Sequence, residues 1–253
     1  MTDSDTESTN NTGTDTPNDA PDDTVNVVAT DLEGTLTEGS TWRGMRGYLL
    51  VHGRRGAYYR FFARHLPSLL LTYLGWREER VFKDAFISGL MTLFAGFSRA
   101  EFGRVAAYVV DTELWPQRHI RVVAELQAQQ ALGNTVVVAS GVFQPIAEHF
   151  AARLGAEALG TPIEMRGDTL SGRLAGPINV GEVKGRRLQA WLEPRPLLRA
   201  YGDTIDDLAM LEQSLEPVVV APDNNLGELA AVRGWRVISA GQLDADRQLA
   251  KDG

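Results

Sequence analysis

The sequence predicts an α/β fold in which a doubly wound parallel sheet carries an inserted α-helical cap domain. Short apolar runs alternate with stretches of helical spacing, a pattern typical of strand–helix–strand crossovers. Several of these runs end directly in polar residues, as expected at the rim where open parallel sheets bind ligands. One long stretch, residues 41–110, breaks the alternation and is dense in leucine and aromatic residues.

The composition is that of an ordinary globular protein, and it restricts the chemistry that the chain can perform. Hydrophobic residues make up 43% of the 253 residues and charged residues 23%. The chain has no cysteine, which excludes disulfides and thiolate metal sites. Its four histidines are scattered without metal-ligand spacing, so a zinc centre is not expected. The lack of cysteine fits a reducing compartment, and we expect a cytoplasmic protein.

Residues 1–24 form an acidic segment that differs from the rest of the chain. They contain seven acidic residues and no Lys or Arg. A segment so poor in apolar residues cannot offset the entropy of ordering, so we predict a disordered tail. The segment also lacks the basic region and apolar core of a signal peptide. The net charge of −8 belongs mainly to it, because 26 acidic and 25 basic residues remain elsewhere.

The α/β core is predicted to comprise residues 25–40 and 111–245, followed by a C-terminal tail, 246–253. Alternating patterns place strands at 25–30, 135–139, 197–201, 217–220 and 235–238, and helices at 118–131, 145–155, 184–192, 206–213 and 226–232. The first strand is apolar throughout, as is typical of a strand buried on both faces. Residues 163–180 differ and read as a hairpin around Gly167-Asp168.

Residues 41–110 are predicted to form a cap of several helices, inserted between the first and second core strands. Their apolar residues recur at helical spacing, and no convincing strand pattern occurs among them. Pro67 and Gly75 are the expected interruptions, because proline removes a helical hydrogen bond and glycine weakens a helix.

Four separated features carry residues suited to phosphoryl transfer. They are Asp31-x-Glu33-Gly34-Thr35 after the first strand, Ser140-Gly141 after the second, Lys184 at a helix start, and Gly202-Asp203-Thr204-Ile205-Asp206-Asp207 after a later strand. Three of the four follow predicted parallel strands, so the fold would gather them on one rim. The two aspartate motifs are moderately specific alone and Ser140-Gly141 or Lys184 alone is not specific, whereas the ordered set in matching contexts is a strong signal.

Two carboxyl groups in the first motif can perform covalent chemistry. The carboxylate of Asp31 can attack phosphorus and form an acyl phosphate, which divides one difficult displacement into two steps. Glu33 can protonate the leaving oxygen and later deprotonate water. Backbone amides of the turn 32–35 would add donors for phosphate oxygens.

An anionic nucleophile and a phosphate repel each other, so their reaction requires positive charge nearby. The other motifs provide residues that carry such a charge or would bind a cation. Carboxylates of Asp31, Asp203 and Asp207 would bind Mg²⁺, a hard ion that prefers oxygen ligands. Lys184 and the hydroxyl of Ser140 would stabilise charge on the transferring phosphoryl oxygens.

In this order the four motifs resemble the haloacid dehalogenase (HAD) superfamily, in particular its phosphoserine-phosphatase-like branch, subfamily IB. The resemblance covers residues 25–240 and implies a HAD-like Rossmannoid core whose helical insertion corresponds to the cap domain. It implies that Asp31 is the nucleophile and Glu33 the acid/base, with the Glu33 backbone carbonyl also reaching the metal. The implied phosphate-binding residues are Thr35, Ser140, Gly141 and Lys184, and the implied metal-site residues are Asp31, Glu33, Asp203 and Asp207.

Glu33 departs from the usual family pattern, which has Asp at this place. Some relatives, including the enolase-phosphatase and a homoserine phosphotransferase type, are similar to this sequence in having Glu there. Glutamate keeps the carboxyl chemistry but reaches one methylene further, so transfer of the phosphoryl group to an alcohol is an alternative to hydrolysis. A catalytically weakened protein that binds a phospho-ligand or a membrane surface is the alternative from another class.

The cap is basic as well as aromatic. Residues 42–110 contain ten Arg and one Lys against four acidic residues. In one interpretation the aromatic residues form the core of the cap while Arg faces water. In the other, this face attracts a polyanionic or amphiphilic phosphate ester or makes peripheral contact with an anionic membrane. Nucleic acid binding is not expected, because the rest of the protein is acidic.

Taken together, these motifs predict a Mg²⁺-dependent hydrolase, a phosphatase that acts on a small phosphorylated substrate. The reaction would pass through an aspartyl-phosphate on Asp31. The cap would select the substrate and shield the intermediate from water.

Overall fold

The computed structural model describes residues 25–73 and 79–252 of the chain. The predicted acidic tail, residues 1–24, and the predicted interruption at Gly75 lie outside this range.

Six strands form one parallel sheet in the order β3-β2-β1-β6-β7-β8. Their bounds are β1 (Val27–Thr30), β2 (Thr135–Phe143), β3 (Glu157–Thr161), β6 (Leu197–Gly202), β7 (Glu216–Val220) and β8 (Arg236–Ile238). The strand order reverses at β1, which lies between β2 and β6. A doubly wound sheet binds ligands at such a point, beyond the carboxyl ends of its strands. The predicted fold class is confirmed.

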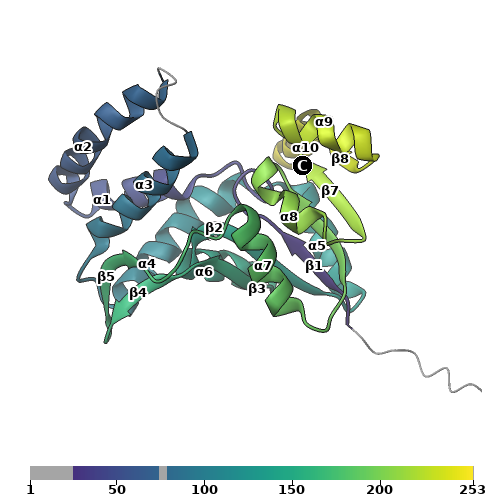
Figure 1. Ribbon diagram of the computed structural model, residues 1–253, viewed down its shortest axis with the longest axis horizontal. Helices are drawn as coiled ribbons and strands as arrows, with labels where there is room; N and C mark the ends of the chain where they lie inside the picture. Colours follow the sequence, from purple (N-terminus) through teal and green to yellow (C-terminus); the bar gives the residue numbers. More distant parts are fainter. Residues whose placement is uncertain (1–24, 74–78, 253) are drawn as a thin grey trace, which may run out of the picture.

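Helices cover both faces of this sheet (Figure 1). One face carries α5 (Ile120–Ala131), α6 (Gln144–Leu154) and α10 (Ala240–Asp252), and the other carries α7 (Gly181–Leu192), α8 (Leu208–Leu211) and α9 (Asn224–Arg233). Successive residues of β1 enter different cores: Val28 packs with α5 and α6, whereas Val27 packs with α7 and α9. This double burial is why the strand is apolar without alternation.

Between β1 and β2 the described chain forms the helices α1 (Thr41–Val51), α2 (Arg55–Tyr73), α3 (Glu79–Met91) and α4 (Arg99–Val109). The 3₁₀ turn η1 (Thr92–Phe94) follows α3, and the π-helical segment η2 (Val110–Leu114) and the 3₁₀ turn η3 (Trp115–Gln117) lead from α4 to α5. Helices α1, α2 and α3 form a group at one end of the molecule, whereas α4 lies beside α6 (Figure 1). Helix α2 continues through Pro67, so the interruption predicted there is wrong. The helix keeps its place because Tyr58 and Phe61 bury against the neighbouring elements, which outweighs one lost hydrogen bond.

A separate antiparallel hairpin, β4 (Ile163–Arg166) and β5 (Thr169–Leu174), confirms the predicted turn at Gly167, whose φ is +62°. Its strand β5 also bonds to the segment before α4, because Leu170 N donates to Phe97 O at 2.7 Å. At the other end, α10 occupies the region where a tail from residue 246 was expected. Arg121 holds that helix through both carboxylate oxygens of Asp246. Among the described residues, no helix combines the length and apolarity needed to cross a bilayer.

Candidate active site

Asp31 occupies the position directly after β1, at the point where the strand order reverses. Its backbone N donates to the carbonyl of Tyr201 on β6 at 2.9 Å, which continues the sheet hydrogen bonding by one residue. The residue is buried, at 6% exposure. The centre of the sheet therefore fixes the backbone from which this carboxylate projects.

The turn after Asp31 brings the backbone against a second carboxylate. Gly34 has φ +90°, and a Cβ on it would lie 2.0 Å from Asp203 Oδ2, so a side chain does not fit there. Thr35 Oγ1 donates to Asp203 Oδ1 at 2.9 Å. The Gly34-Thr35 pair thus sets the orientation of Asp203, which follows β6.

Asp207 lies in the 3₁₀ turn η4 (Ile205–Asp207) just beyond β6. Its Oδ2 accepts from the backbone N of Asp203 at 3.0 Å and of Thr204 at 3.2 Å. This capping interaction satisfies the amides after the strand and leaves Oδ1 to accept from the ammonium group of Lys184.

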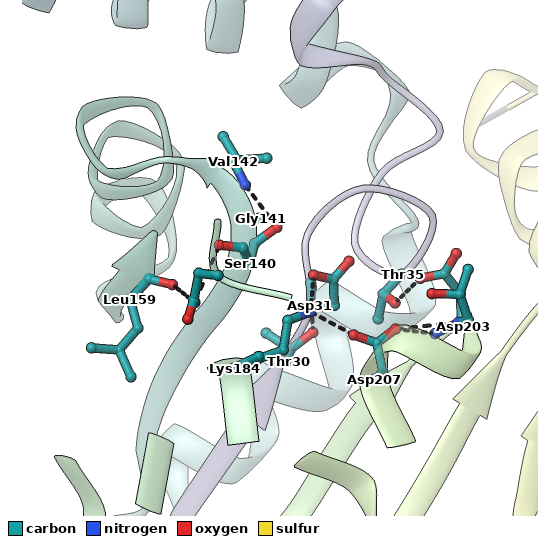
Figure 2. A network of polar contacts seen from close by, with 12 residues as sticks. Thr30, Asp31, Thr35, Ser140, Gly141, Val142, Leu159, Lys184, Asp203 and Asp207 are labelled. Atoms are coloured by element: carbon teal, nitrogen blue, oxygen red, sulfur yellow. Dashed lines mark hydrogen bonds and ion pairs between the residues drawn. The ribbon is translucent and has the colours of Figure 1, made fainter. Parts of the chain in front are cut away.

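Lys184 joins two of the carboxylates. It comes from the first turn of α7, is 2% exposed, and donates to Asp31 Oδ1 at 2.7 Å and to Asp207 Oδ1 at 2.5 Å. Figure 2 shows its ammonium group directed between these two side chains. Burial alone would lower the pKa of Lys184, but the charges of Asp207 and Asp31 raise it above its usual range. Lys184 is therefore a permanent cation of the site.

The three carboxylates fit a hard divalent cation. Asp31, Asp203 and Asp207 each offer one oxygen, and these atoms lie within 4.8 Å of one another. Burial raises the pKa of Asp31 to about 6 against the opposing charge of Lys184. Burial, with repulsion from Asp31 and Asp207, raises the pKa of Asp203 to about 8. One ammonium group does not balance three carboxylates, two of them buried and one half-buried, and a divalent cation bound here would supply the charge that is lacking.

Glu33 lies outside this carboxylate cluster, although it lines the same cavity. One of its carboxylate oxygens accepts a hydrogen bond from the backbone N of Thr41, the first residue of α1. Burial raises the pKa of Glu33, and the hydrogen bond from Thr41 and the charge of Arg43 oppose this. A carboxyl group with a raised pKa suits a proton donor near neutral pH.

The segment Ser140-Gly141 lies inside β2, not after its end as the sequence predicted. The strand continues to Phe143 because its pairing with β3 resumes after an irregularity between Ala139 and Phe143. Ser140 lines the cavity at this irregularity. Its hydroxyl is near the backbone N of Val142, at 3.5 Å.

Two buried residues that sequence reasoning missed hold this segment in place. Asn179 Nδ2 donates to the carbonyls of Ser140 and Leu159, at 3.2 and 2.6 Å, and Thr161 Oγ1 donates to Gly141 O at 2.6 Å. Both side chains are fully buried. Neither residue belongs to a motif, and their role arises from the approach of β3, which was not predicted, to the bulge in β2.

Thr35, expected to bind phosphate, is fully buried and does not line the cavity in the described structure. Its hydroxyl is engaged with Asp203 instead. The remaining predicted site residues, Asp31, Glu33, Ser140, Gly141, Lys184, Asp203 and Asp207, all line one cavity of about 760 Å³. This size is typical of a small-molecule site.

Comparisons with known proteins agree with the α/β fold that carries this site. Residues 28–212 match the family described as haloacid dehalogenase-like hydrolase. The histidinol-phosphatase of Neisseria meningitidis serogroup C is 30% identical over 231 residues, which cover 85% of this chain and 98% of that protein. The crystal structure of a protein of unknown function from Bordetella pertussis Tohama I is similar to this fold, with a TM-score of 0.72 and 22% sequence identity. The matched region covers 85% of this chain and 99% of that protein's chain. The phospho-aspartyl intermediate analogue of phosphoserine phosphatase shares the fold, with a TM-score of 0.54 at 13% identity, over 81% of this chain and 90% of its own.

Proposed function

The chain belongs to the haloacid dehalogenase-like hydrolase family, and within it we propose a Mg²⁺-dependent phosphatase that hydrolyses a phosphomonoester through an aspartyl-phosphate on Asp31. One observation carries the proposal: a buried carboxylate at the strand reversal contacts Lys184 at 2.7 Å and shares its surroundings with two further carboxylates within 4.8 Å. The phospho-aspartyl analogue described for a protein of the same fold supports this chemistry.

The first half of the reaction transfers the phosphoryl group to the protein. An oxygen of Asp31 forms a bond to phosphorus while the bond from phosphorus to the substrate oxygen breaks. Glu33 donates its proton to that departing oxygen, so the product leaves as a neutral alcohol. Lys184 and the hydroxyl of Ser140 stabilise charge on the phosphoryl oxygens.

The second half regenerates the enzyme. The carboxylate of Glu33 takes a proton from water, whose oxygen forms a new bond to phosphorus. The bond between phosphorus and Asp31 breaks, which releases inorganic phosphate and restores the free carboxylate. A Mg²⁺ ion held by Asp31, Asp203 and Asp207 would supply positive charge that offsets the repulsion between carboxylate and phosphate.

A phosphate-release assay tests this proposal. With p-nitrophenyl phosphate and Mg²⁺ we expect turnover that EDTA abolishes and that Asp31→Asn lowers about a thousandfold or more. Asp244→Asn, on the exposed surface of α10, is the matched control and should behave as wild type. Activity that survives chelation or the Asp31→Asn substitution contradicts the mechanism. If an added alcohol becomes phosphorylated, the protein is a phosphotransferase.

Helix α2 favours a second role, peripheral contact with an anionic membrane surface. Leu66, Leu70 and Leu71 are exposed on it, Arg60 and Arg64 are exposed one to two turns earlier, and neither α1 nor α2 contains an acidic residue. Basic and apolar groups on one helix are the combination that binds anionic lipid surfaces. We expect cosedimentation with phosphatidylserine vesicles, weakened by salt and by Arg60→Glu with Arg64→Glu. Equal recovery with phosphatidylcholine vesicles, or none with either, contradicts this role.

A further inference from the structure

Resting on the function proposed above, we propose that the substrate is an amphiphilic phosphomonoester, whose leaving alcohol carries an aromatic or aliphatic body and no second anionic group. The cavity that holds Asp31 and Lys184 extends from these charged residues to side chains of the three helices α1, α2 and α3. The phosphate of the substrate would therefore lie at the polar end of the cavity. The leaving group would lie against the side chains of these helices.

The helical side of the cavity is apolar. It is lined by Trp42 of α1, Phe62 and Leu69 of α2, and Phe86, Ile87 and Leu90 of α3. Trp42 and Phe86 pack edge to face, with ring centroids 6.1 Å apart. Trp42 and Leu69 nevertheless each keep 38% of their surface exposed, so they present apolar area that a ligand can cover. Covering it is favourable by about 25 cal/mol per Å².

The core side of the cavity continues this apolar lining. Val142 and Phe143 of β2, Ile178 and Val180 before α7, and Ile205 after β6 all contribute to it. Ile205 is 43% exposed beside the carboxylate cluster. A leaving group would consequently meet apolar side chains on two sides directly beyond the phosphate.

The charges around the cavity argue against a polyanionic substrate. Lys184 is the single cation among its described lining residues, and it is already paired with Asp31 and Asp207. Glu33 and Asp206 line the cavity too, and neither supplies a positive charge for a second anion. A carboxylate or second phosphate on the leaving group would have no lining cation beside it.

The arginines of residues 42–110 whose side chains the structure describes lie outside this cavity. Arg43 pairs with Glu113 at 2.7 Å, Arg46 lies over the ring of Tyr58, and Arg54 lies 4.5 Å from the ring centroid of Phe97. None of the described arginines between 42 and 110 lines the cavity. Of the two substrate types that the cap composition left open, the geometry favours the amphiphile.

A series of n-alkyl phosphates tests the inference, because their leaving alcohols differ in length but little in reactivity. From methyl to octyl phosphate, below the concentration at which octyl phosphate forms micelles, we expect kcat/KM to rise by about two- to fourfold per methylene over the part of the chain that is buried. Phosphoserine, histidinol phosphate and a sugar bisphosphate should fall below octyl phosphate. No dependence on chain length, or a preference for one of these polar substrates, overturns the inference.

Leu69→Gln locates the effect in the cavity. We expect it to lower the octyl-to-methyl ratio of kcat/KM by about threefold or more. Leu70→Gln is the matched control, because Leu70 is exposed on the same helix and does not line the cavity, and it should leave the ratio unchanged. An unchanged ratio in Leu69→Gln contradicts the assignment of this wall.

The two proposals fail in different ways. If Asp31-dependent phosphate release occurs with every ester at similar kcat/KM, the phosphatase stands and the amphiphilic substrate is wrong. If no ester in the series, p-nitrophenyl phosphate included, releases phosphate in an Asp31-dependent way, the proposed function itself is wrong.

Discussion

Gly34 is the residue whose backbone conformation brings the turn after β1 against Asp203, one of the proposed metal ligands. A Cβ there would lie 2.0 Å from Asp203 Oδ2, at a φ of +90° that L side chains rarely adopt. We expect Gly34→Ala to displace the Asp203 carboxylate, lowering kcat by about 10- to 100-fold and raising the Mg²⁺ concentration needed for half activity. Titration of activity and of Mg²⁺-dependent thermal stability measures both effects.

Gly133 provides a matched control for this substitution. Its φ of +88° is nearly the same, but a Cβ on it would meet nothing within 4 Å. Gly133→Ala should therefore lose stability, by about 1–2 kcal/mol from backbone strain alone, without any change in the Mg²⁺ requirement. If both variants change the Mg²⁺ requirement equally, the contact with Asp203 is not what Gly34 provides.

Asn179 is a positioning residue for Ser140. Asn179→Ala leaves the carbonyls of Ser140 and Leu159 without the donor that they have now, so we expect a loss of about 1–3 kcal/mol in the free energy of unfolding. Because Ser140 should then shift, inhibition by inorganic phosphate should weaken as well. Urea denaturation and phosphate inhibition measure the two effects, with the exposed Asn225→Ala as control. Lost stability with unchanged phosphate inhibition would make Asn179 purely structural.

Residue types and spacing predicted much of the candidate site, because each of Asp31, Asp203 and Asp207 follows a strand that the apolar pattern reveals. Lys184 could be predicted only as a helix start, and its contact with two carboxylates depends on how α7 packs. Thr35 and Asn179 show where such reasoning stops. Their hydroxyl and amide groups act on partners 168 and 39 residues away, and no local pattern encodes those contacts.

At the scale of the elements, the N-terminus of α1 connects the helical insertion to Glu33. The backbone N of Thr41 donates to the Glu33 carboxylate, and Ser40 before it has the extended φ −129°, ψ 125° that precedes proline readily. Thr41→Pro should remove this donor while α1 persists, since proline is tolerated in the first helical turn. The pKa of Glu33, which this bond lowers, should rise further.

The pH profile of kcat/KM for an alkyl phosphate measures that change. Protonated Glu33 is needed to expel a poor leaving group, so the alkaline limb should move to higher pH in Thr41→Pro. Thr41→Val keeps the backbone N–H and separates the contribution of the hydroxyl. If circular dichroism shows α1 intact in Thr41→Pro and the alkaline limb of the profile does not move, then that limb does not report the titration of Glu33.

The strands with apolar or β-branched residues in a run were predicted, whereas the strand without such a run was missed. Strand β3 (Glu157–Thr161) lies at the edge of the sheet, and its sequence Glu-Ala-Leu-Gly-Thr has no run of β-branched residues. The extension of β2 through Ser140 depends on pairing with that unpredicted edge. Local sequence was therefore enough to predict the central strands and the opposite edge strand β8, whereas β3 depends on tertiary contacts.

At the scale of the whole molecule, buried charge at the site opposes folding when no cation is bound. The raised pKa of Asp203, about 8 against an ordinary 3.8, means that the folded chain binds this proton more tightly than the unfolded chain does. Asp31, at about 6, acts in the same direction at lower pH. Lys184 keeps its proton throughout this range, because its pKa lies higher still. Folding and metal binding should consequently be linked through pH.

This linkage gives a prediction with a definite sign. Between pH 6 and 8, the Asp203 contribution to the free energy of unfolding in EDTA should fall as pH rises, by at most about 1.4 kcal/mol per unit, because the folded chain keeps a proton that the unfolded chain has released. Saturating Mg²⁺ should remove this loss, and Asp203→Asn should remove it without Mg²⁺, while the exposed Asp244→Asn keeps it. Urea denaturation at pH 6, 7 and 8 measures the slopes. If Asp203→Asn and wild type show the same slope in EDTA, Asp203 is already ionised in the metal-free protein, and the site does not need a cation for the charge balance argued above.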